Sequence, residues 1–445
     1  MRENYRYRSV KGMNDVFPGE ARRFRCLEDL ARVHFARYGC GEIRTPLVEH
    51  TVLFERGVGE GTDIVNKEMF YVPAKDENDA GALRRMVLRP EATASVVRAY
   101  VEHEIDKTAP GVQRYFYIGP MFRYERPQKG RLRQFHQIGV EWLGVASLDG
   151  DEGPGTRADR AGHAAAEDAE VVCLLWDLCL AAGVPGLELQ LNSVGCPACR
   201  PGYAERLRTF AAGQADALCA DCRKRIQSNP LRLFDCKVPA CREIMTRAPL
   251  LQDHLCDACR DQQAGVEGQL AAVPIRFTRN PRMVRGLDYY TRTVFELVSN
   301  DLGAQNAVAA GGRYDNLVES LEGPVTPAVG WSLGVERLLD LLPAEEGPDR
   351  LDAFLLNTGP DPAHTLREVT RWRRAGLRVA WEKEARSRKA MLKRADRSGA
   401  VFAVFVGIDK LEIKHMATGE QNETDWQGAA DSMLAQRRRN GEARP

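Results

Sequence analysis

The chain has 445 residues, and 63 Lys and Arg stand against 62 Asp and Glu, so the formal net charge is only +1. With 44% hydrophobic and 28% charged residues, the composition is that of a globular protein and excludes a disordered or fibrous chain. The length exceeds that of one compact core, so two or three domains are expected. No membrane partner is expected, because the apolar stretch at 171–184 is interrupted by Asp177 and is too short to cross a bilayer.

The first part of the chain predicts one helix and two long strands. Apolar residues recur at helical spacing over 20–38, and Gly39 ends the pattern. An extended segment follows, and Pro46 within it cannot donate a ladder hydrogen bond, which places the segment at a sheet edge or an interface. Two strands are expected at 115–122 and 134–143, joined by a polar and basic loop.

The middle of the chain predicts an insert, a packed helix and further strands. Residues 145–168 combine acidic residues with glycines and a proline and predict a mobile insert, and an apolar helix is expected at about 168–182. Strand-like runs stand at 273–277, 293–298 and 306–310. A Gly-rich turn is expected to open a helix within 330–342.

The C-terminal part predicts a separate small domain. Residues 343–350 read as a linker, and beyond it apolar runs alternate with helical stretches, which favours an α/β domain with some parallel strands. Between 361 and 445 there are 18 Lys and Arg against 12 Asp and Glu. Such a basic face fits RNA phosphates, and it equally fits a solvated helix surface.

A nucleotide-binding platform is predicted at 122–141, where a strand, a basic loop and a returning strand follow one another. Arg123 can bind a phosphate as a bidentate fork, and Glu125 can accept a hydrogen bond from an exocyclic amine. The alternative interpretation is a hairpin with an exposed basic loop.

Three shorter clusters carry weaker signals. In Arg89 to Thr93, Glu91 can hold an ammonium group, or it can be the acidic first turn of a helix. The paired glycines of Gly311 to Asp315 permit a turn against a ligand, or a simple hairpin corner. In Gly330 to Leu338, two glycines let the backbone approach a ligand and Arg337 can reach a triphosphate, whereas the alternative is an ordinary turn with an exposed arginine.

Residues 285–290 form the most informative cluster, Arg-Gly-Leu-Asp-Tyr-Tyr, directly before a strand-like run. The arginine supplies a fixed positive charge and the two tyrosines supply hydroxyl hydrogen bonds. This combination favours a site for a small, planar, polar ligand.

The segment 196–262 is polar and contains eight of the twelve cysteines of the chain. The cysteines form four close pairs: Cys196 and Cys199, Cys219 and Cys222, Cys236 and Cys241, Cys256 and Cys259. Two Cys-x2-Cys pairs can complete one tetrahedral structural zinc site, and the candidate ligand set is Cys219, Cys222, Cys256 and Cys259. The alternative is a set of reduced buried thiols. Cysteines used in this way, without an apolar leader segment, indicate a cytoplasmic protein.

Taken together, these clusters resemble the three signature motifs of class II aminoacyl-tRNA synthetases. The helix at 20–38 with the Pro46 segment is similar to motif one, Phe122 to Glu125 to motif two, and Gly330 to Arg337 to motif three. The remaining clusters resemble motifs particular to histidyl-tRNA synthetases of the bacterial type. They are Arg89 to Thr93, Gln137 to Glu141, Arg285 to Tyr290 and Gly311 to Asp315.

The resemblance implies an α/β fold class, with an α+β catalytic domain built on the class II antiparallel sheet flanked by helices. The implied catalytic domain is split over 1–195 and 263–342, around a Cys-rich insertion domain at 196–262. A C-terminal α/β anticodon-binding domain is implied at 351–445, after the linker at 343–350. The family also implies a homodimer formed through the helix and strand of motif one.

The activity implied by the resemblance is that of a histidine–tRNA ligase. ATP, with Mg²⁺, activates L-histidine to histidyl-adenylate and pyrophosphate, and the histidine then passes to the 3′ end of histidine tRNA. The implied catalytic residues are Arg123, Arg285 and Arg337, and the implied ATP contacts are these three and Glu125. The implied histidine contacts are Glu91, Thr93, Arg123, Gln137, Glu141, Arg285, Tyr289 and Tyr290.

One alternative within the same superfamily is a non-catalytic paralogue, the histidine-binding regulatory subunit of an ATP phosphoribosyltransferase. Such paralogues typically lack the C-terminal domain and the arginines that hold ATP. This chain has both the C-terminal domain and Arg123, Arg285 and Arg337, which favours the enzyme.

Overall fold

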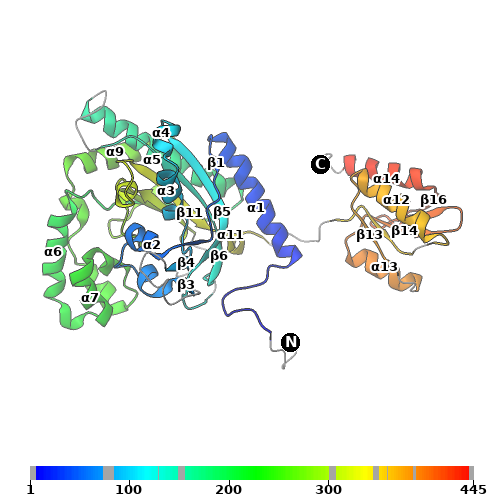
Figure 1. The fold of residues 1–445 in the computed structure, drawn as a ribbon, viewed down its shortest axis with the longest axis horizontal. Coiled ribbons are helices and arrows are strands. Elements are labelled where there is room, and N and C mark those ends of the chain that lie inside the picture. The colour runs from blue at the N-terminus through cyan, green and yellow to red at the C-terminus, as the bar shows by residue number, and fades with distance from the viewer. Residues whose placement is uncertain are drawn as a thin grey trace. The chain divides into compact units, whose positions relative to one another are not determined.

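The structure is a computed structural model that describes residues 7–73, 85–128, 130–148, 156–299, 307–343, 350–357, 359–383 and 387–439. The chain divides into two compact units, residues 1–15 with 24–343 and residues 16–23 with 344–445. Figure 1 labels many of the helices and strands named below. Most of the predicted linker, residues 344–349, lies outside the described part.

An eight-stranded sheet forms the centre of the first unit, in the order β1-β5-β6-β11-β10-β9-β7-β8. The strands are β1 (Gly41–Glu42), β5 (Gln113–Phe122), β6 (Gln134–Leu143), β7 (Leu187–Ser193), β8 (Phe277–Arg279), β9 (Thr291–Ser299), β10 (Ala307–Arg313) and β11 (Ala328–Gly334). Only the two edge pairs, β1 with β5 and β7 with β8, are parallel. The expected class II architecture, an antiparallel sheet flanked by helices, is confirmed.

Strand alternation separates the two faces of this sheet. Ile138, Val140 and Trp142 of β6 enter one hydrophobic core, together with α1 (Pro18–Arg37) and α5 (Arg157–Ala181). Their neighbours Gln137 and Glu141 therefore point to the opposite face, because successive side chains of a strand alternate. That second face carries α3 (Thr93–Glu102), and it is where the candidate site lies.

The predicted start of α5 at about 168 is wrong, because the helix begins at Arg157. Thr156 and Asp159 form a capping box, which satisfies N–H groups at the start of the helix. The part of the predicted mobile insert between 149 and 155 lies outside the described residues.

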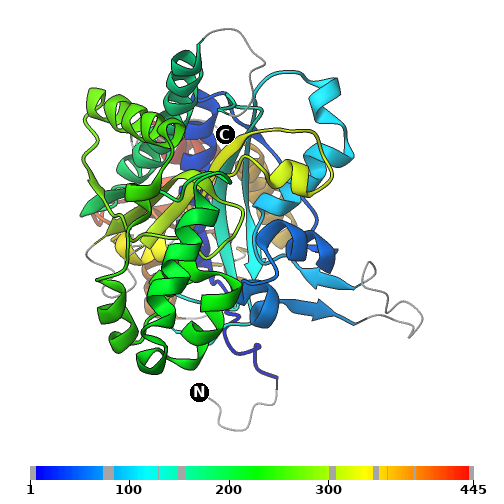
Figure 2. The same ribbon diagram turned by 90° about the vertical axis from the view of Figure 1, so that its left-hand side faces the viewer.

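A small sheet and a helical insertion complete the first unit. The small sheet has the order β2-β4-β3, with bounds Val48–His50, Met86–Leu88 and Phe70–Val72, and α2 (Thr51–Val58) follows β2. The insertion contains α6 (Arg200–Ala212), α7 (Ala220–Ser228), α8 (Pro239–Met245) and α9 (Asp257–Ala272). α6 and α7 lie on the side of the unit away from α1 (Figures 1 and 2). The expected domain boundary at 262 falls inside α9, which packs against α5.

Short helices stand at other points of this unit: α4 (Ile105–Thr108), α10 (Leu317–Ser320) and α11 (Val335–Leu341). The predicted strand at 273–277 begins only at Phe277, since α9 continues to Ala272.

The second unit has a five-stranded sheet of order β13-β12-β14-β15-β16. Its strands are β12 (Ala353–Leu355), β13 (Val379–Trp381), β14 (Phe402–Val406), β15 (Leu411–His415) and β16 (Gln421–Thr424), and its helices are α12 (Pro362–Arg374), α13 (Arg388–Arg397) and α14 (Trp426–Arg439). β12 pairs in parallel with β13 and β14, which confirms the predicted parallel strands. The antiparallel hairpin of β15 and β16 was not predicted, because β16 is exposed and polar.

Candidate active site

Glu141 of β6 is the centre of a buried polar cluster on the second face of the sheet. Thr93, the first residue of α3, donates its hydroxyl to Glu141 Oε1 at 2.7 Å, and the Tyr314 hydroxyl donates to Oε2. Burial raises the pKa of Glu141 to about 8. A Cβ at Gly330 on the neighbouring strand would lie 2.0 Å from Glu141 Oε2, so only glycine fits there. The carboxylate is thus held by two hydroxyl groups, in a space that is open because the neighbouring strand has a glycine at position 330.

Three tyrosines form an aromatic wall beside this carboxylate. The ring centroids of Tyr289 and Tyr290 are 4.7 Å apart, and those of Tyr289 and Tyr314 are 5.6 Å apart. All three side chains are buried, and they precede or follow strands β9 and β10. Tyr314 lies within the predicted Gly311 to Asp315 cluster but had no predicted role, and the buried Tyr117 of β5 was not predicted as a site residue. Neither tyrosine differs from a core residue in the sequence pattern.

Glu91 has a structural role at the start of α3. Its two carboxylate oxygens accept hydrogen bonds from the backbone N–H groups of Thr93 at 2.8 Å and Ala94 at 2.9 Å. Burial raises its pKa. Glu91 therefore lies at a helix start, as the alternative had it, but not in the first turn, because the helix begins at Thr93. A contact with an ammonium group stays a prediction that the remaining lone pairs allow.

Gln137 lies two residues before Gly139 on the same face of β6 as Glu141. Its Nε2 donates to Ser332 Oγ of β11 at 3.2 Å. Its Oε1 is buried, and no hydrogen-bond partner is found for it among the described residues. Because an unsatisfied buried acceptor costs free energy, this oxygen is suited to accept from a ligand.

The arginines of motifs two and three gather next to this buried polar cluster. Arg123 donates from Nε to the Pro90 carbonyl at 2.9 Å, and its guanidinium stands 5.3 Å from the ring centroid of Phe135. Arg337 donates to the carbonyls of Gly130, at 3.0 Å, and Ala307, at 2.7 Å. Burial, together with nearby arginines that include Arg123, lowers the pKa of Arg337. Arg123 and Arg337 therefore lie close enough to act on each other, and the carboxylates of Glu125 and Glu296 also act on Arg337.

Glu125 and Arg285 are both engaged in ion pairs. Glu125 accepts from Arg131 of the basic loop at 3.0 Å. Arg285 pairs with Glu296 of β9. The negative charge of Glu296 also tends to raise the pKa of Arg337, so both arginines lie near the same carboxylate. Arg285 Nε is buried, and among the described residues no hydrogen bond is found for it. The structure thus brings the three predicted arginines to the same region, beside Glu141 and the tyrosines.

The paired glycines do not form a turn, so both turn interpretations of this segment are wrong. Gly311 and Gly312 lie inside β10, where a Cβ would meet the Gly330 carbonyl oxygen at 2.3 Å or the Thr293 carbonyl oxygen at 2.5 Å. Glycine is needed here because the neighbouring strands β11 and β9 approach too closely for a side chain. The next residue, Arg313, is fully buried and pairs with Asp168 at 3.0 Å, a structural contact.

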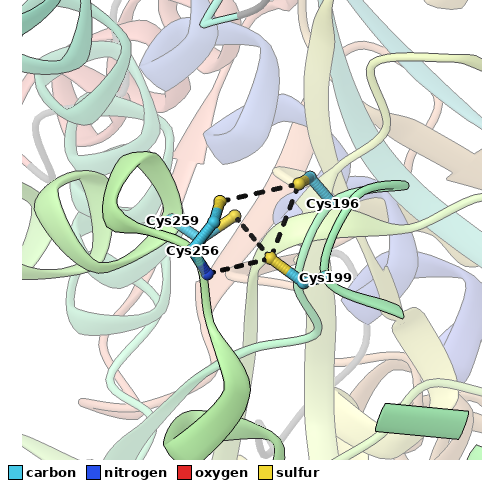
Figure 3. Close-up of side chains that lie close together, drawn as sticks. All are labelled: Cys196, Cys199, Cys256 and Cys259. Carbon is cyan, nitrogen blue, oxygen red and sulfur yellow. Dashed lines mark hydrogen bonds between the residues drawn. The ribbon is translucent and has the colours of Figure 1, made fainter. Parts of the chain in front are cut away.

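The cysteines form two clusters of four, and the predicted ligand set is therefore wrong. Cys256 and Cys259 gather with Cys196 and Cys199, whereas Cys219 and Cys222 gather with Cys236 and Cys241. Figure 3 shows the first cluster. The chain after β7 meets the start of α9 there, and the starts of α7 and α8 meet in the second cluster. Each set can hold a metal ion, and the described cysteines form no disulfide.

Among the described residues, no helix has the length and apolarity needed to cross a bilayer.

Comparisons with known proteins agree with this geometry. The family model described as histidyl-tRNA synthetase matches residues 12–152 and 211–338. Among curated relatives, a histidine–tRNA ligase of Geobacter metallireducens is 43% identical over 93% of this chain and 96% of the relative. One of Syntrophotalea carbinolica is 42% identical over 97% of this chain and 99% of the relative.

Solved structures show the same likeness. The apo histidyl-tRNA synthetase of S. aureus aligns with a TM-score of 0.74 at 30% identity, covering 96% of this chain and 99% of that one. A Bacillus halodurans protein titled ATP phosphoribosyltransferase regulatory subunit/histidyl-tRNA synthetase, at 20% identity and a TM-score of 0.58, shares the fold. The family match and the relatives together lead to one assignment: the chain belongs to the histidyl-tRNA synthetase family.

Proposed function

We propose that this chain is a histidine–tRNA ligase. It activates L-histidine with ATP to histidyl-adenylate and pyrophosphate, and it transfers the histidine to the 3′ end of histidine tRNA. The observation that carries the proposal is the buried carboxylate of Glu141, held by two hydroxyls beside an arginine cluster. The part of the site around Glu141 suits a small polar ring, and the part around the arginines suits a polyphosphate.

The activation step is the attack of the histidine carboxylate on the α-phosphorus of ATP. Pyrophosphate leaves with the electron pair of the broken P–O bond. Arg123 is proposed to contact both the α-phosphate and the attacking carboxylate, Arg285 the opposite face of the α-phosphate, and Arg337 the γ-phosphate. These fixed charges would offset the negative charge that gathers on the phosphate oxygens, and positioning supplies most of the remaining acceleration. Mg²⁺ held by phosphate oxygens and water would add positive charge, and Glu125 is proposed to lie at the adenine.

Histidine selectivity is proposed to come from partners for both ring nitrogens. Glu141 accepts a hydrogen bond from one ring N–H, and the Tyr290 hydroxyl serves the other nitrogen, while Tyr289 lines the pocket. An amino acid without a matching ring would leave these buried groups unpaired, at a cost of about 1–3 kcal/mol each. Glu91 and Thr93 are proposed to receive the α-ammonium group, and Gln137 the carboxylate end.

Further parts of the proposal concern the assembly. The helix of motif one and the Pro46 segment are proposed to form a homodimer interface, and residues 351–445 to bind the anticodon arm of the tRNA. The insertion at 196–262 is proposed to be a domain of its own that carries structural zinc. Cytoplasmic location is proposed from the many reduced cysteines.

The test is aminoacylation with [³H]histidine and bulk tRNA, together with histidine-dependent ATP–pyrophosphate exchange. The proposal expects both reactions with wild-type protein. Histidine binding without exchange would contradict it and would indicate a non-catalytic regulatory paralogue instead.

A further inference from the structure

The two cysteine clusters have the dimensions of tetrahedral metal sites. In the first cluster, the sulfur of Cys196 lies 3.6 Å from that of Cys199 and 3.8 Å from that of Cys256, and the sulfurs of Cys199 and Cys259 are 3.7 Å apart. In a regular tetrahedron with Zn–S bonds of about 2.3 Å, the sulfurs are about 3.8 Å apart. A disulfide would need about 2.05 Å, so this spacing fits one shared ion rather than a covalent bond.

The second cluster has similar distances between sulfurs, and in both clusters a backbone N–H group donates to a sulfur. The sulfurs of Cys219 and Cys236 are 3.8 Å apart, and the backbone N–H of Cys219 donates to the sulfur of Cys241 at 3.3 Å. In the first cluster, the Cys256 N–H donates to the sulfur of Cys199 at 3.1 Å. Such N–H donors stabilise thiolates, which are the form that binds a metal.

The first cluster is also connected to the tyrosines of the pocket. Arg292 is only 1% exposed, and it donates from Nη1 to the sulfur of Cys259 at 3.3 Å and from Nε to Asp315 at 3.1 Å. It follows Tyr290 by two residues, and Asp315 directly follows Tyr314. One guanidinium therefore links the cluster to both tyrosine-bearing segments.

The backbone adds further links at the same place. The Val194 N–H donates to the Arg292 carbonyl at 2.7 Å, the Arg292 N–H donates to the Gly195 carbonyl at 2.9 Å, and Arg200 donates to the Tyr290 carbonyl. Arg292 has a φ of 53°, a conformation that costs about 1–3 kcal/mol in a residue with a side chain. The surrounding contacts must hold this backbone in place.

We propose that each chain holds two structural Zn²⁺ ions, one in each cluster, and that the ion bound by Cys196, Cys199, Cys256 and Cys259 positions Tyr289 and Tyr290 through Arg292. The role of the first ion rests on the proposed function, whereas the two sites themselves do not. Arg292 is a positioning residue, since it acts on the histidine through the tyrosines.

The metal content is tested by elemental analysis of full-length protein purified without chelator. We expect about two zinc ions per chain in the wild type, and about one in each double variant, Cys256→Ser with Cys259→Ser and Cys219→Ser with Cys222→Ser. The control is Cys26→Ser, at an exposed free cysteine of α1, which should keep both ions. Less than about a tenth of an ion per wild-type chain, or iron in place of zinc, would overturn the sites.

The coupling is tested with Arg292→Gln, which leaves all eight sulfurs in place. We expect both zinc ions to remain, the KM for histidine in ATP–pyrophosphate exchange to rise about tenfold, and the KM for ATP to stay within about twofold. Arg292→Lys keeps the positive charge but loses the forked guanidinium group, so its KM for histidine should lie between those of the wild type and Arg292→Gln. The matched control is Arg114→Gln on β5, whose guanidinium stacks 4.0 Å from the Trp142 ring centroid and should affect neither constant. An unchanged histidine KM in Arg292→Gln with full zinc would overturn the coupling. If the wild type fails to activate histidine, the proposed function fails while the zinc count still decides the sites.

Discussion

Replacing Glu141 with glutamine tests the centre of the proposed pocket with the smallest change of shape. Glutamine has the same size, so it fits between Thr93, Tyr314 and the space that Gly330 leaves free. The hydroxyl that faces the new amide NH2 group can rotate to accept from it, and the other hydroxyl can still donate to the amide oxygen, so the fold should remain. What is lost is the ability of this side chain to become a carboxylate that accepts a hydrogen bond from the histidine ring.

The expected loss follows from the strength of one buried hydrogen bond to a charged group. Such a bond contributes about 1.5–3 kcal/mol, which corresponds to roughly a 10- to 150-fold loss in kcat/KM for histidine. Tyr314→Phe removes only a neutral donor to Glu141, and its expected loss of about 1 kcal/mol is roughly fivefold.

The assay is ATP–pyrophosphate exchange, first with histidine varied at saturating ATP and then with ATP varied at saturating histidine. The KM for ATP should stay within about twofold, because Glu141 is not proposed to contact ATP. Glu102→Gln serves as the control, since Glu102 pairs with Arg98 on an exposed part of α3. A kcat/KM for histidine within twofold of wild type in Glu141→Gln would refute the proposed role of this carboxylate.

Three further predictions use the same site. Arg285→Ala should lower the exchange rate at least about 100-fold while the circular dichroism spectrum stays that of the wild type, and wild-type-like exchange would contradict its role at the α-phosphate. Gly330→Ala should destabilise the first unit by about 1–3 kcal/mol, because the added Cβ would overlap Glu141 Oε2. The measurement is the Tm, which should fall, and an unchanged Tm would show that the strand can shift. In the absence of ligand, the pKa of Glu141 is about 8 in the folded protein and about 4.5 in the unfolded chain, so the folded state keeps a proton that the unfolded chain loses. The free energy of unfolding should therefore contain a contribution that is complete below about pH 4.5 and falls by up to about 1.4 kcal/mol per pH unit towards pH 8, and urea titrations should find this slope missing in Glu141→Gln.

Local patterns in the sequence predicted much of the central sheet. The strand predicted at 134–143 is β6, and the structure places its residues Ile138, Val140 and Trp142 in the core. The helix α1 and the parallel strands of the second unit were predicted in the same way. Where a polar segment forms structure, as in the first half of α5, the apolar periodicity was too weak and only the capping box of Thr156 marked the start.

Parts of the site depend on contacts between distant segments, and those could not be read from local patterns. Four cysteine pairs can be combined into two sites of four ligands in three ways, and spacing alone does not choose between them. The choice is made by the fold, which brings the end of β7 to the start of α9. Tyr314 is a similar case. β10 pairs with β11 and β11 pairs with β6, and this strand order places Tyr314 beside Glu141 of β6.

The buried charges behind the pocket explain why these distant segments meet in one arrangement. Asp168 of α5 and Arg313 of β10 are both fully buried and paired, and Asp315 joins Arg313 to Arg292. Removing one partner of a buried pair leaves an uncompensated charge, at a cost of about 3–5 kcal/mol, so a shifted strand would be strongly disfavoured. We expect this network to add little net stability over apolar packing and to act mainly by disfavouring alternative registers of β10. Since Tyr314 stands between Arg313 and Asp315, the same charges that fix the strand also place its hydroxyl at Glu141.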